Sequence, residues 1–309
     1  MNRGLKALSI VTTFVMFLVL LAGALVTNTG SADGCGASWP LCKGTFMPEW
    51  DYEAIIEASH RGISSLAGLL ALVLAVWTWR AAARRPLIRW LGLGTLLMVC
   101  LQGALGAMAV IWPQPKAVLA LHFGISLLCF SGTVLVTTLL SGEGRPAGVE
   151  ANPVFRRWVW TVAIYAYGVV YLGAYVRHVK ASAACVGWPL CNGELVPPLY
   201  GLTAVNFIHR LAAGMLALMV LRLAFMATQQ VGRPDLKRAA WLAVGLILAQ
   251  VAGGALFGLG YINLATQQLH TALITLFWGA LSYLSLQVLP ARSAATPPAL
   301  DGKRPGLAH

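Results

Sequence analysis

Long apolar runs separated by short polar stretches dominate this sequence. Eight of the runs reach the roughly 20 residues that an α-helix needs to cross the ~30 Å hydrocarbon core of a membrane. Because a backbone in lipid must satisfy its own hydrogen bonds, these runs predict helices and not strands or loops. The predicted segments are 7–27, 57–79, 88–112, 117–140, 158–177, 204–228, 238–258 and 267–289. The pattern therefore predicts an all-α polytopic membrane protein with eight transmembrane helices.

Composition and charge agree with a membrane protein and indicate its orientation. Of the 309 residues, 58% are apolar and only 10% are charged, which is not typical of soluble domains. The net charge of +12 is compatible with nucleic-acid binding, but its distribution along the chain argues against that partner. With both termini in the cytoplasm, 16 of the 22 lysines and arginines fall on the cytoplasmic side, as the positive-inside rule predicts. The other six are Lys43, Arg61, Lys116, Arg177, Lys180 and Arg210.

The predicted location is therefore a bacterial inner membrane, with the cysteine-containing loops outside. An N-terminal signal peptide is the alternative for the first segment, since Arg3 and Lys6 precede an apolar run. That run is long for a signal sequence, and its counterpart at 158–177 is internal, so we interpret it as a helix. No amphipathic, arginine-rich transit peptide precedes it in this sequence.

An internal repeat divides the chain into two halves of four segments each. The repeated positions are Gly23, Cys35, Cys42 and His60-Arg61 in the first half, and Gly173, Cys185, Cys191 and His209-Arg210 in the second. The glycine precedes the first cysteine by 12 residues in both halves, and the second cysteine precedes the histidine by 18. The repeat predicts two pseudo-symmetric four-helix bundles in the same orientation. Their predicted bounds are 1–140 and 158–290, with a cytoplasmic linker at 141–157 and a disordered cytoplasmic tail at 291–309.

Four histidines lie at one predicted depth in the membrane, in the even-numbered segments. They are His60, His122, His209 and His270, and the second histidine of each half follows the first by 62 or 61 residues. Facing imidazoles in an apolar bundle are suitable axial ligands for haem iron. Arg61 and Arg210 are then expected to pair with the haem propionates. For a single intramembrane histidine a hydrogen-bonded core role is equally plausible, but the repeated spacing favours iron ligation.

Other histidine roles fit the sequence less well. Zinc is disfavoured because no carboxylate or thiol lies at the same depth in both halves. His178 has no counterpart in the repeat, so we interpret it as an interfacial residue, and His309 belongs to the tail.

The six cysteines fall into two groups. Four lie in the outer loops as two pairs, Cys35 with Cys42 and Cys185 with Cys191. Oxidising conditions outside the membrane allow each pair to close a small disulfide loop. A structural staple and a redox-active pair that passes electrons outward both remain open. Cys100 and Cys129 lie within predicted helices, where buried packing thiols are the simplest interpretation.

The two halves differ three residues before the first histidine, where Glu57 in one corresponds to Asn206 in the other. A carboxylate three residues from His60 shares its helical face, so it lies in reach of a haem edge. There it is a candidate for proton transfer or for stabilising a cation. A carboxylate at a helix start, favoured by the helix dipole, is the alternative. The substitution by Asn in an otherwise similar half favours a catalytic Glu57.

Together these positions resemble the haem A synthase family over essentially the whole chain. The resemblance rests on Glu57-x-x-His60-Arg61, the outer cysteine pairs, His122, His209-Arg210 and His270. It implies a membrane oxidoreductase that oxidises one ring methyl of haem O to a formyl group, giving haem A. It also implies that the N-terminal half, with Glu57, holds the substrate haem, and that the C-terminal half holds a permanent haem b.

Further expectations follow from the same resemblance. Cys35 and Cys42 are expected to form a disulfide with a role in activity, and Cys185 and Cys191 a structural counterpart. Haem O synthase is the expected supplier of substrate and terminal oxidase assembly the destination of the product. Membrane lipid and further copies of the chain are other expected partners. The reaction requires an electron acceptor, which the sequence leaves open.

Two other functions remain in competition at this stage. A non-catalytic di-haem b-type cytochrome explains the four histidines but makes the Glu57/Asn206 difference incidental. A thiol-oxidising membrane enzyme requires exposed cysteines of low pKa, which nothing in the sequence indicates.

Overall fold

A computed structural model describes residues 2–46, 50–142 and 150–290, and within them the chain is helical, with no strand longer than an isolated bridge. Two short 3₁₀ turns, η1 (Ser31–Asp33) and η2 (Ala181–Ala183), follow the first and fifth helices. The eight helices are α1 (Arg3–Thr29), α2 (Tyr52–Ala81), α3 (Pro86–Ile111), α4 (Lys116–Ser141), α5 (Pro153–His178), α6 (Gly201–Thr228), α7 (Pro234–Gly258) and α8 (Leu264–Gln287). All eight are long and apolar enough to cross a membrane, which confirms the predicted fold class.

Each helix begins one to five residues before its predicted apolar segment, and at four of the eight starts an Asn or Asp side chain caps the helix. Asp51 accepts a hydrogen bond from the Ala54 amide at the start of α2, and Asn152 accepts one from Val154 at the start of α5. Helix α2 therefore starts five residues before the predicted segment, and α5 starts inside the predicted linker. The predicted disordered tail, 291–309, lies outside the described residues.

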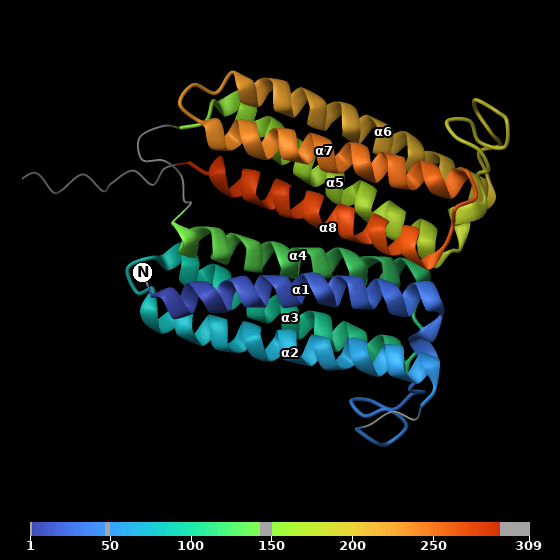
Figure 1. Ribbon diagram of the computed structural model, residues 1–309, viewed down its shortest axis with the longest axis horizontal. Helices are drawn as coiled ribbons and strands as arrows, with labels where there is room; N and C mark the ends of the chain where they lie inside the picture. The colour runs from blue at the N-terminus through green and yellow to red at the C-terminus, as the bar shows by residue number, and fades with distance from the viewer. Residues whose placement is uncertain (1, 47–49, 143–149, 291–309) are drawn as a thin grey trace, which may run out of the picture.

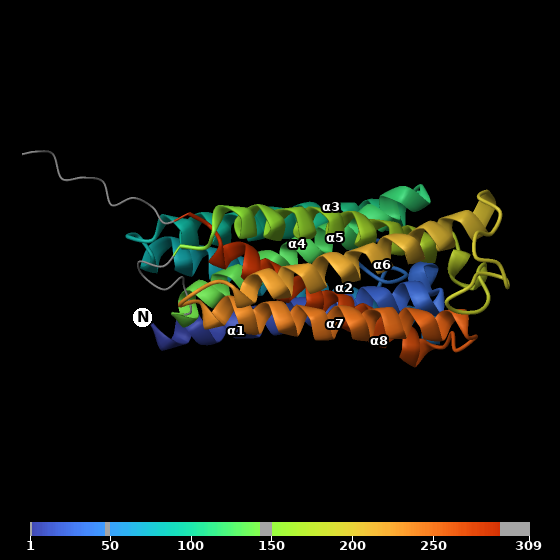
Figure 2. The same cartoon turned by 90° about the horizontal axis from the view of Figure 1, so that it is seen from above.

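Helices α1 to α4 lie on one side of the molecule and α5 to α8 on the other (Figure 1). Within each group the contacts form a ring: α1 packs on α2 and α4, α3 packs on α2 and α4, and α5 to α8 are arranged in the same order. Helices α2 and α4 are therefore diagonal across the first group, as are α6 and α8 across the second. Figure 2 shows the helices running side by side, with the loops that follow α1 and α5 at the same end. The pseudo-symmetry axis itself stays a prediction.

A continuous apolar core joins the two groups through α1, α4, α5 and α8. Trp278 of α8 is central to this contact, because its Nε1 donates hydrogen bonds to Leu127 O at 3.1 Å and to Ser131 Oγ at 2.6 Å. The Ser131 and Ser282 hydroxyls are also 2.7 Å apart across the same interface. These polar contacts between helices fix the register of one group against the other. Cys129 is buried as expected, whereas Cys100 is exposed on α3, which corrects the interpretation of Cys100 as a packing thiol.

On the cytoplasmic side proposed above, Arg233 joins the start of α7 to the end of α8. Its side chain is 1% exposed, donates to both carboxylate oxygens of Asp235 and reaches the Gln287 carbonyl at 3.2 Å. A buried cation is stable only when it is paired, and here Asp235 supplies the anion.

Candidate functional site

The four predicted histidines lie at similar depths, near the loop-bearing end of four helices. His60 and His209 are eight residues after the starts of α2 and α6, and His122 and His270 are six residues after the starts of α4 and α8. At 1.5 Å per residue these positions are about 9–12 Å inside the helices. The histidines of each half come from diagonal helices, so their side chains can face one another across the bundle.

The first histidine of each half packs against a glycine of a neighbouring helix. A Cβ at Gly23 of α1 would lie 3.1 Å from Cε1 of His60, and one at Gly173 of α5 would lie 2.8 Å from Cε1 of His209. Any larger residue would push the imidazole away, so the repeated glycine sets the position of the repeated histidine. The sequence marked these glycines only as members of the repeat, and the structure shows what they contact.

The second histidine of each half packs more loosely on glycine. A Cβ at Gly106 of α3 would lie 3.6 Å from His122, and one at Gly253 or Gly254 of α7 would lie 3.5 Å from His270. These are ordinary van der Waals distances. In each half, both imidazoles are thus cradled by small residues of the odd-numbered helices, as a bundle that binds a large flat ligand requires.

The imidazoles have the properties expected of metal ligands. Nδ1 of each of the four is buried without a hydrogen-bond partner, although buried polar atoms are normally satisfied. The described residues contain no cluster of three His, Cys, Asp or Glu side chains suited to a bare metal ion. Two imidazoles per half therefore fit an axially ligated haem better than zinc.

Both predicted cysteine pairs form disulfides in the loops above the histidines. Cys35 and Cys42 have a Cα–Cα distance of 4.5 Å, and Cys185 and Cys191 one of 4.8 Å. All four cysteines are buried, so the bridges face the helices and not the solvent. The disulfide prediction is confirmed for both pairs.

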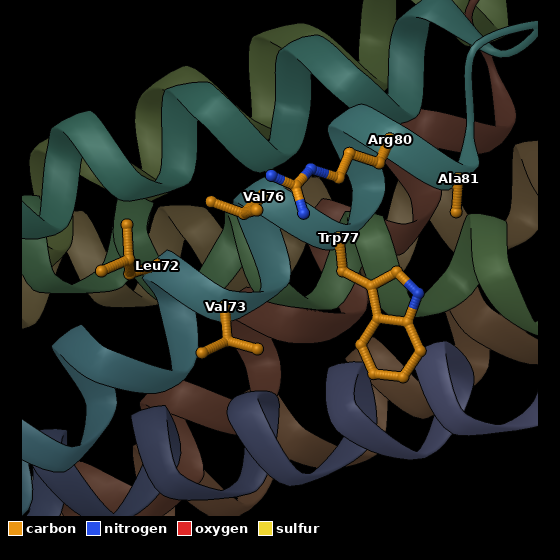
Figure 3. Close-up of a pocket in the computed structure, with 6 residues that line it drawn as sticks. All are labelled: Leu72, Val73, Val76, Trp77, Arg80 and Ala81. Carbon is orange, nitrogen blue, oxygen red and sulfur yellow. The ribbon is translucent and has the colours of Figure 1, made fainter.

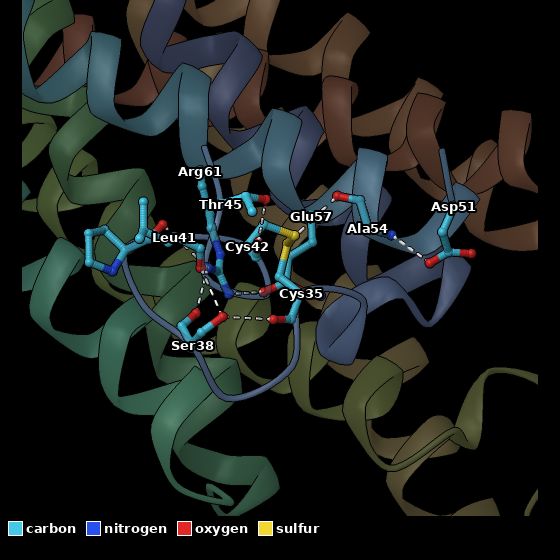
Figure 4. Close-up of a disulfide and its surroundings, with 10 residues drawn as sticks. Cys35, Ser38, Leu41, Cys42, Thr45, Asp51, Ala54, Glu57 and Arg61 are labelled. Atoms are coloured by element: carbon cyan, nitrogen blue, oxygen red, sulfur yellow. Dashed lines mark hydrogen bonds and ion pairs between the residues drawn. A yellow bond between two sulfur atoms is a disulfide. The ribbon is translucent and has the colours of Figure 1, made fainter. Parts of the chain in front are cut away.

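Glu57 connects helix α2 to the first disulfide loop (Figure 4). Only 3% exposed, it accepts a hydrogen bond from the Cys35 amide at 2.8 Å and forms an ion pair with Arg61 one turn later. The Arg61 guanidinium also donates to the carbonyls of Ser38 and Leu41 in the loop, at 2.8 Å and 2.7 Å. Glu57 is the sixth residue of α2, and the first-turn acid is Glu53, so Glu57 is not a helix-start carboxylate.

The second half has the same framework with an amide in place of the carboxylate. Asn206 is 6% exposed and accepts from Nε of Arg210 at 3.0 Å. Its Nδ2 donates to the Ala181 carbonyl at 2.7 Å, so the amide provides a donor where Glu57 has only acceptors. Arg210 also donates to the Gly187 and Cys185 carbonyls. Each arginine therefore holds its loop, and pairing of Arg61 and Arg210 with propionates stays a prediction.

Comparison with known proteins agrees with this site. Residues 47–282 match the family model described as cytochrome oxidase assembly protein, COX15-CtaA. The chain belongs to this family. The relatives it resembles include the protein named Heme A synthase from Symbiobacterium thermophilum, 55% identical over 296 residues, which cover 93% of this chain and 96% of that protein.

Other relatives carry the same name at lower identity. The Heme A synthase of Geobacillus kaustophilus is 41% identical, with 95% of this chain and 94% of that protein covered. That of Shouchella clausii is 40% identical, with 93% and 98% covered. The similarity thus extends over both four-helix groups of this member of the family.

Helix α5 ends with Arg177 and His178. His178, predicted to be interfacial, is partly buried as the last residue of α5, and its interfacial role stays a prediction. The side chain of Arg177 contacts α8 of the same four-helix group, where its Nη2 donates a hydrogen bond to Thr271 Oγ1 at 2.9 Å. The sequence pattern indicated Arg177 only as a cation on the outer side. The available signal was its place four residues after Gly173, where the first half has Thr27.

An apolar groove on the outside of α2 is separate from the histidines (Figure 3). It is lined by Leu72, Val73, Val76, Trp77, Arg80 and Ala81. Its nearest lining residue is 12 positions after His60, which is about 18 Å along a helix. The groove therefore has no part in the histidine sites.

Proposed function

We propose that this chain is a haem A synthase, which oxidises one ring methyl of haem O to the formyl group of haem A. Its family and the shared name of its relatives support this activity. The observation that carries it is the carboxylate of Glu57 in a framework where the other half has Asn206. An electron-transfer cytochrome needs two haem sites but has no need for a buried acid in only one.

On this proposal residues 1–140 hold the substrate haem through His60 and His122. Residues 158–290 hold a resident haem b through His209 and His270. The unpartnered Nδ1 atoms and the glycine cradles support ligation in both halves. When bound by His209 and His270, the resident haem would supply one-electron redox chemistry.

The chemistry converts a methyl group and one water into a formyl group, with the release of four electrons and four protons. A first two-electron oxidation of the methyl gives an electron-poor carbon, which water attacks to form a hydroxymethyl group. A second gives a hydrate that loses water to the aldehyde. An external acceptor takes the electrons. Glu57 is suited to stabilise positive charge at that carbon or accept a proton, because its oxygens only accept hydrogen bonds.

The fixed position of Glu57 contributes to this role. Hydrogen bonds from the Cys35 amide and from Arg61 hold the carboxylate in one place, so little reorganisation is needed when charge develops nearby. The same hydrogen bonds join the carboxylate to the Cys35–Cys42 disulfide loop. This connection is the route by which the disulfide would influence activity.

The proposed location is a bacterial inner membrane, with both termini cytoplasmic and the disulfide loops outside. The bias of basic residues supports this orientation. Haem O synthase is the proposed supplier of substrate, and assembly of several copies of this chain is a further part of the proposal.

The test is to purify the wild-type protein and the Glu57→Gln variant from cells that make haem O, and to extract and identify the haems. Glu57→Gln is expected to bind haem in both halves but to make little or no haem A. Glu53→Gln, an exposed acid one turn earlier on α2, is the matched control and should keep wild-type product. Wild-type yield of haem A from Glu57→Gln would exclude the catalytic role. Two equivalents of haem b and no haem O or product in the wild-type protein would favour the cytochrome.

A further inference from the structure

Helix α5 carries a cation that the first half of the molecule does not have. Arg177 is four residues after Gly173, so the two residues share one face of α5. Gly173 contacts the His209 imidazole. Arg177 therefore lies one helical turn from this contact, toward the loop that follows α5. The matching position in α1, four residues after Gly23, is Thr27.

The surroundings of Arg177 leave most of its donors available. The one hydrogen bond of its side chain in the described part of the chain is from Nη2 to Thr271 Oγ1, at 2.9 Å. Thr271 is 1% exposed and follows His270 directly. Among the described residues, no carboxylate lies within ion-pair distance of Arg177. A partly buried guanidinium that has five N–H donors and only one hydrogen-bond partner is a suitable binding site for an anion.

Neither Thr27 nor Arg210 offers the same binding capacity. Thr27 is short and neutral, and its hydroxyl donates to the Gly23 carbonyl of its own helix at 3.1 Å. Arg210 uses Nε, Nη1 and Nη2 for Asn206 and the loop carbonyls. Of these residues, all within the described part of the chain, Arg177 is the cation that lies near the second histidine pair and keeps donors available for an anionic ligand.

We propose that Arg177 binds a propionate of the haem held by His209 and His270, and that Thr27 leaves the first site without this anchor. The inference rests on the proposed function, which assigns a resident haem to one half and an exchanging substrate to the other. A site that must release its product on every turnover cannot retain it as tightly as a resident group. The Arg177/Thr27 difference provides that asymmetry in retention.

The experiment measures transfer of haem b from the purified full-length protein to excess apomyoglobin. Removing a charge-assisted hydrogen bond speeds dissociation by roughly 10- to 100-fold, and Arg177→Gln is expected to show this change. Arg177→Lys keeps the positive charge, so its rate of haem release should lie between those of Arg177→Gln and the wild type. Arg222→Gln is the matched control, since this cation is exposed on α6, where it stacks on Trp158 at 4.7 Å. It should release haem at the wild-type rate.

A second measurement separates an electrostatic role from simple packing. A cation beside a haem favours the reduced iron, so Arg177→Gln should lower the midpoint potential of the resident haem while Arg177→Lys preserves it. Equal defects in both variants with an unchanged potential would overturn the proposal. The reciprocal Thr27→Arg variant should slow haem release from the first site, and an unchanged rate there would also count against it.

Failure of the inference is distinguishable from failure of the proposed function. His209→Ala should abolish binding of the resident haem. If it does so while Arg177→Gln retains haem at the wild-type rate, the role of Arg177 is wrong and the haem assignment stands. If His209→Ala keeps full haem content and an unchanged absorption spectrum, the resident site itself is misassigned, and the proposal for Arg177 fails with it.

Discussion

Replacing Gly173 by alanine tests whether the packing of α5 positions the His209 imidazole. The added Cβ would lie 2.8 Å from Cε1 of His209, whereas carbon atoms in contact prefer about 3.5–4.0 Å. The ring must therefore move by roughly 0.7 Å or more, unless α5 shifts as a whole. A binding site tolerates about 0.5 Å of error in its ligating groups, so the displacement is large enough to impair iron ligation.

The same substitution has a smaller expected effect on folding. Overpacking in a helix interface costs about 1–3 kcal/mol. Replacing glycine by alanine within a helix recovers about 1 kcal/mol. The free energy of unfolding should thus fall by only about 0–2 kcal/mol, and haem binding should be affected more than stability.

The assay compares haem content per protein, the low-spin absorption of the bis-imidazole haem, and the thermal midpoint in detergent. Gly168→Ala lies on the same helix with nothing within 4 Å of the added Cβ, so it controls for helix propensity. Gly254→Ala makes an ordinary 3.5 Å contact with His270 and should reduce haem content less than Gly173→Ala. Gly173→Ala protein with wild-type haem content and spectrum would refute the argument that this glycine positions the ligand.

Three further predictions address the loop, the interface and the polar contact at the opposite end. Gly34→Ala would place a Cβ 2.4 Å from the backbone carbonyl carbon of Glu53, so the first disulfide loop must move away from α2. Dithiothreitol should then reduce the disulfide of this loop faster than in the wild type, and an unchanged reduction rate would contradict the prediction. Trp278→Phe removes the indole hydrogen bonds to Leu127 and Ser131 between the two groups and should lower the free energy of unfolding by about 1 kcal/mol, measured by thermal unfolding; no loss of stability would show that these bonds contribute little. Arg233→Met removes the hydrogen bonds between a buried cation and the partly exposed Asp235, and should lower the free energy of unfolding by about 2 kcal/mol; a variant as stable as wild type would show the pair to be neutral.

The Glu57/Asn206 comparison is where sequence and structure contribute most equally. The sequence identified the difference through the repeat, but it gave two readings for Glu57, one catalytic and one at a helix start. Capping by Asp51 moves the helix start to Tyr52, which removes the second reading. The structure also gives Glu57 partners that the sequence did not predict, because the Cys35 amide is 22 residues away in the chain.

For the arginines, the tertiary structure contributes more than the local sequence does. Arg61 and Arg210 follow histidines directly, and this local pattern predicted propionate binding. In the structure their guanidinium groups reach carbonyls of the disulfide loops, which come within range only when each loop folds back over its helix. Arg177 is separated from His209 and His270 by long stretches of chain, so local pattern could not link it to them.

The sequence by itself determined the eight helices and the four histidines. Apolar length is matched to bilayer thickness, and the repeat places each histidine at a set distance from its neighbours, so both are local properties of the chain. The tertiary structure decided which glycine touches which imidazole, which arginine is engaged by a loop, and which one remains available beside a histidine pair. Those outcomes depend on the rotation of each helix about its axis and on the folding of the loops, and both are set by packing between segments distant in sequence.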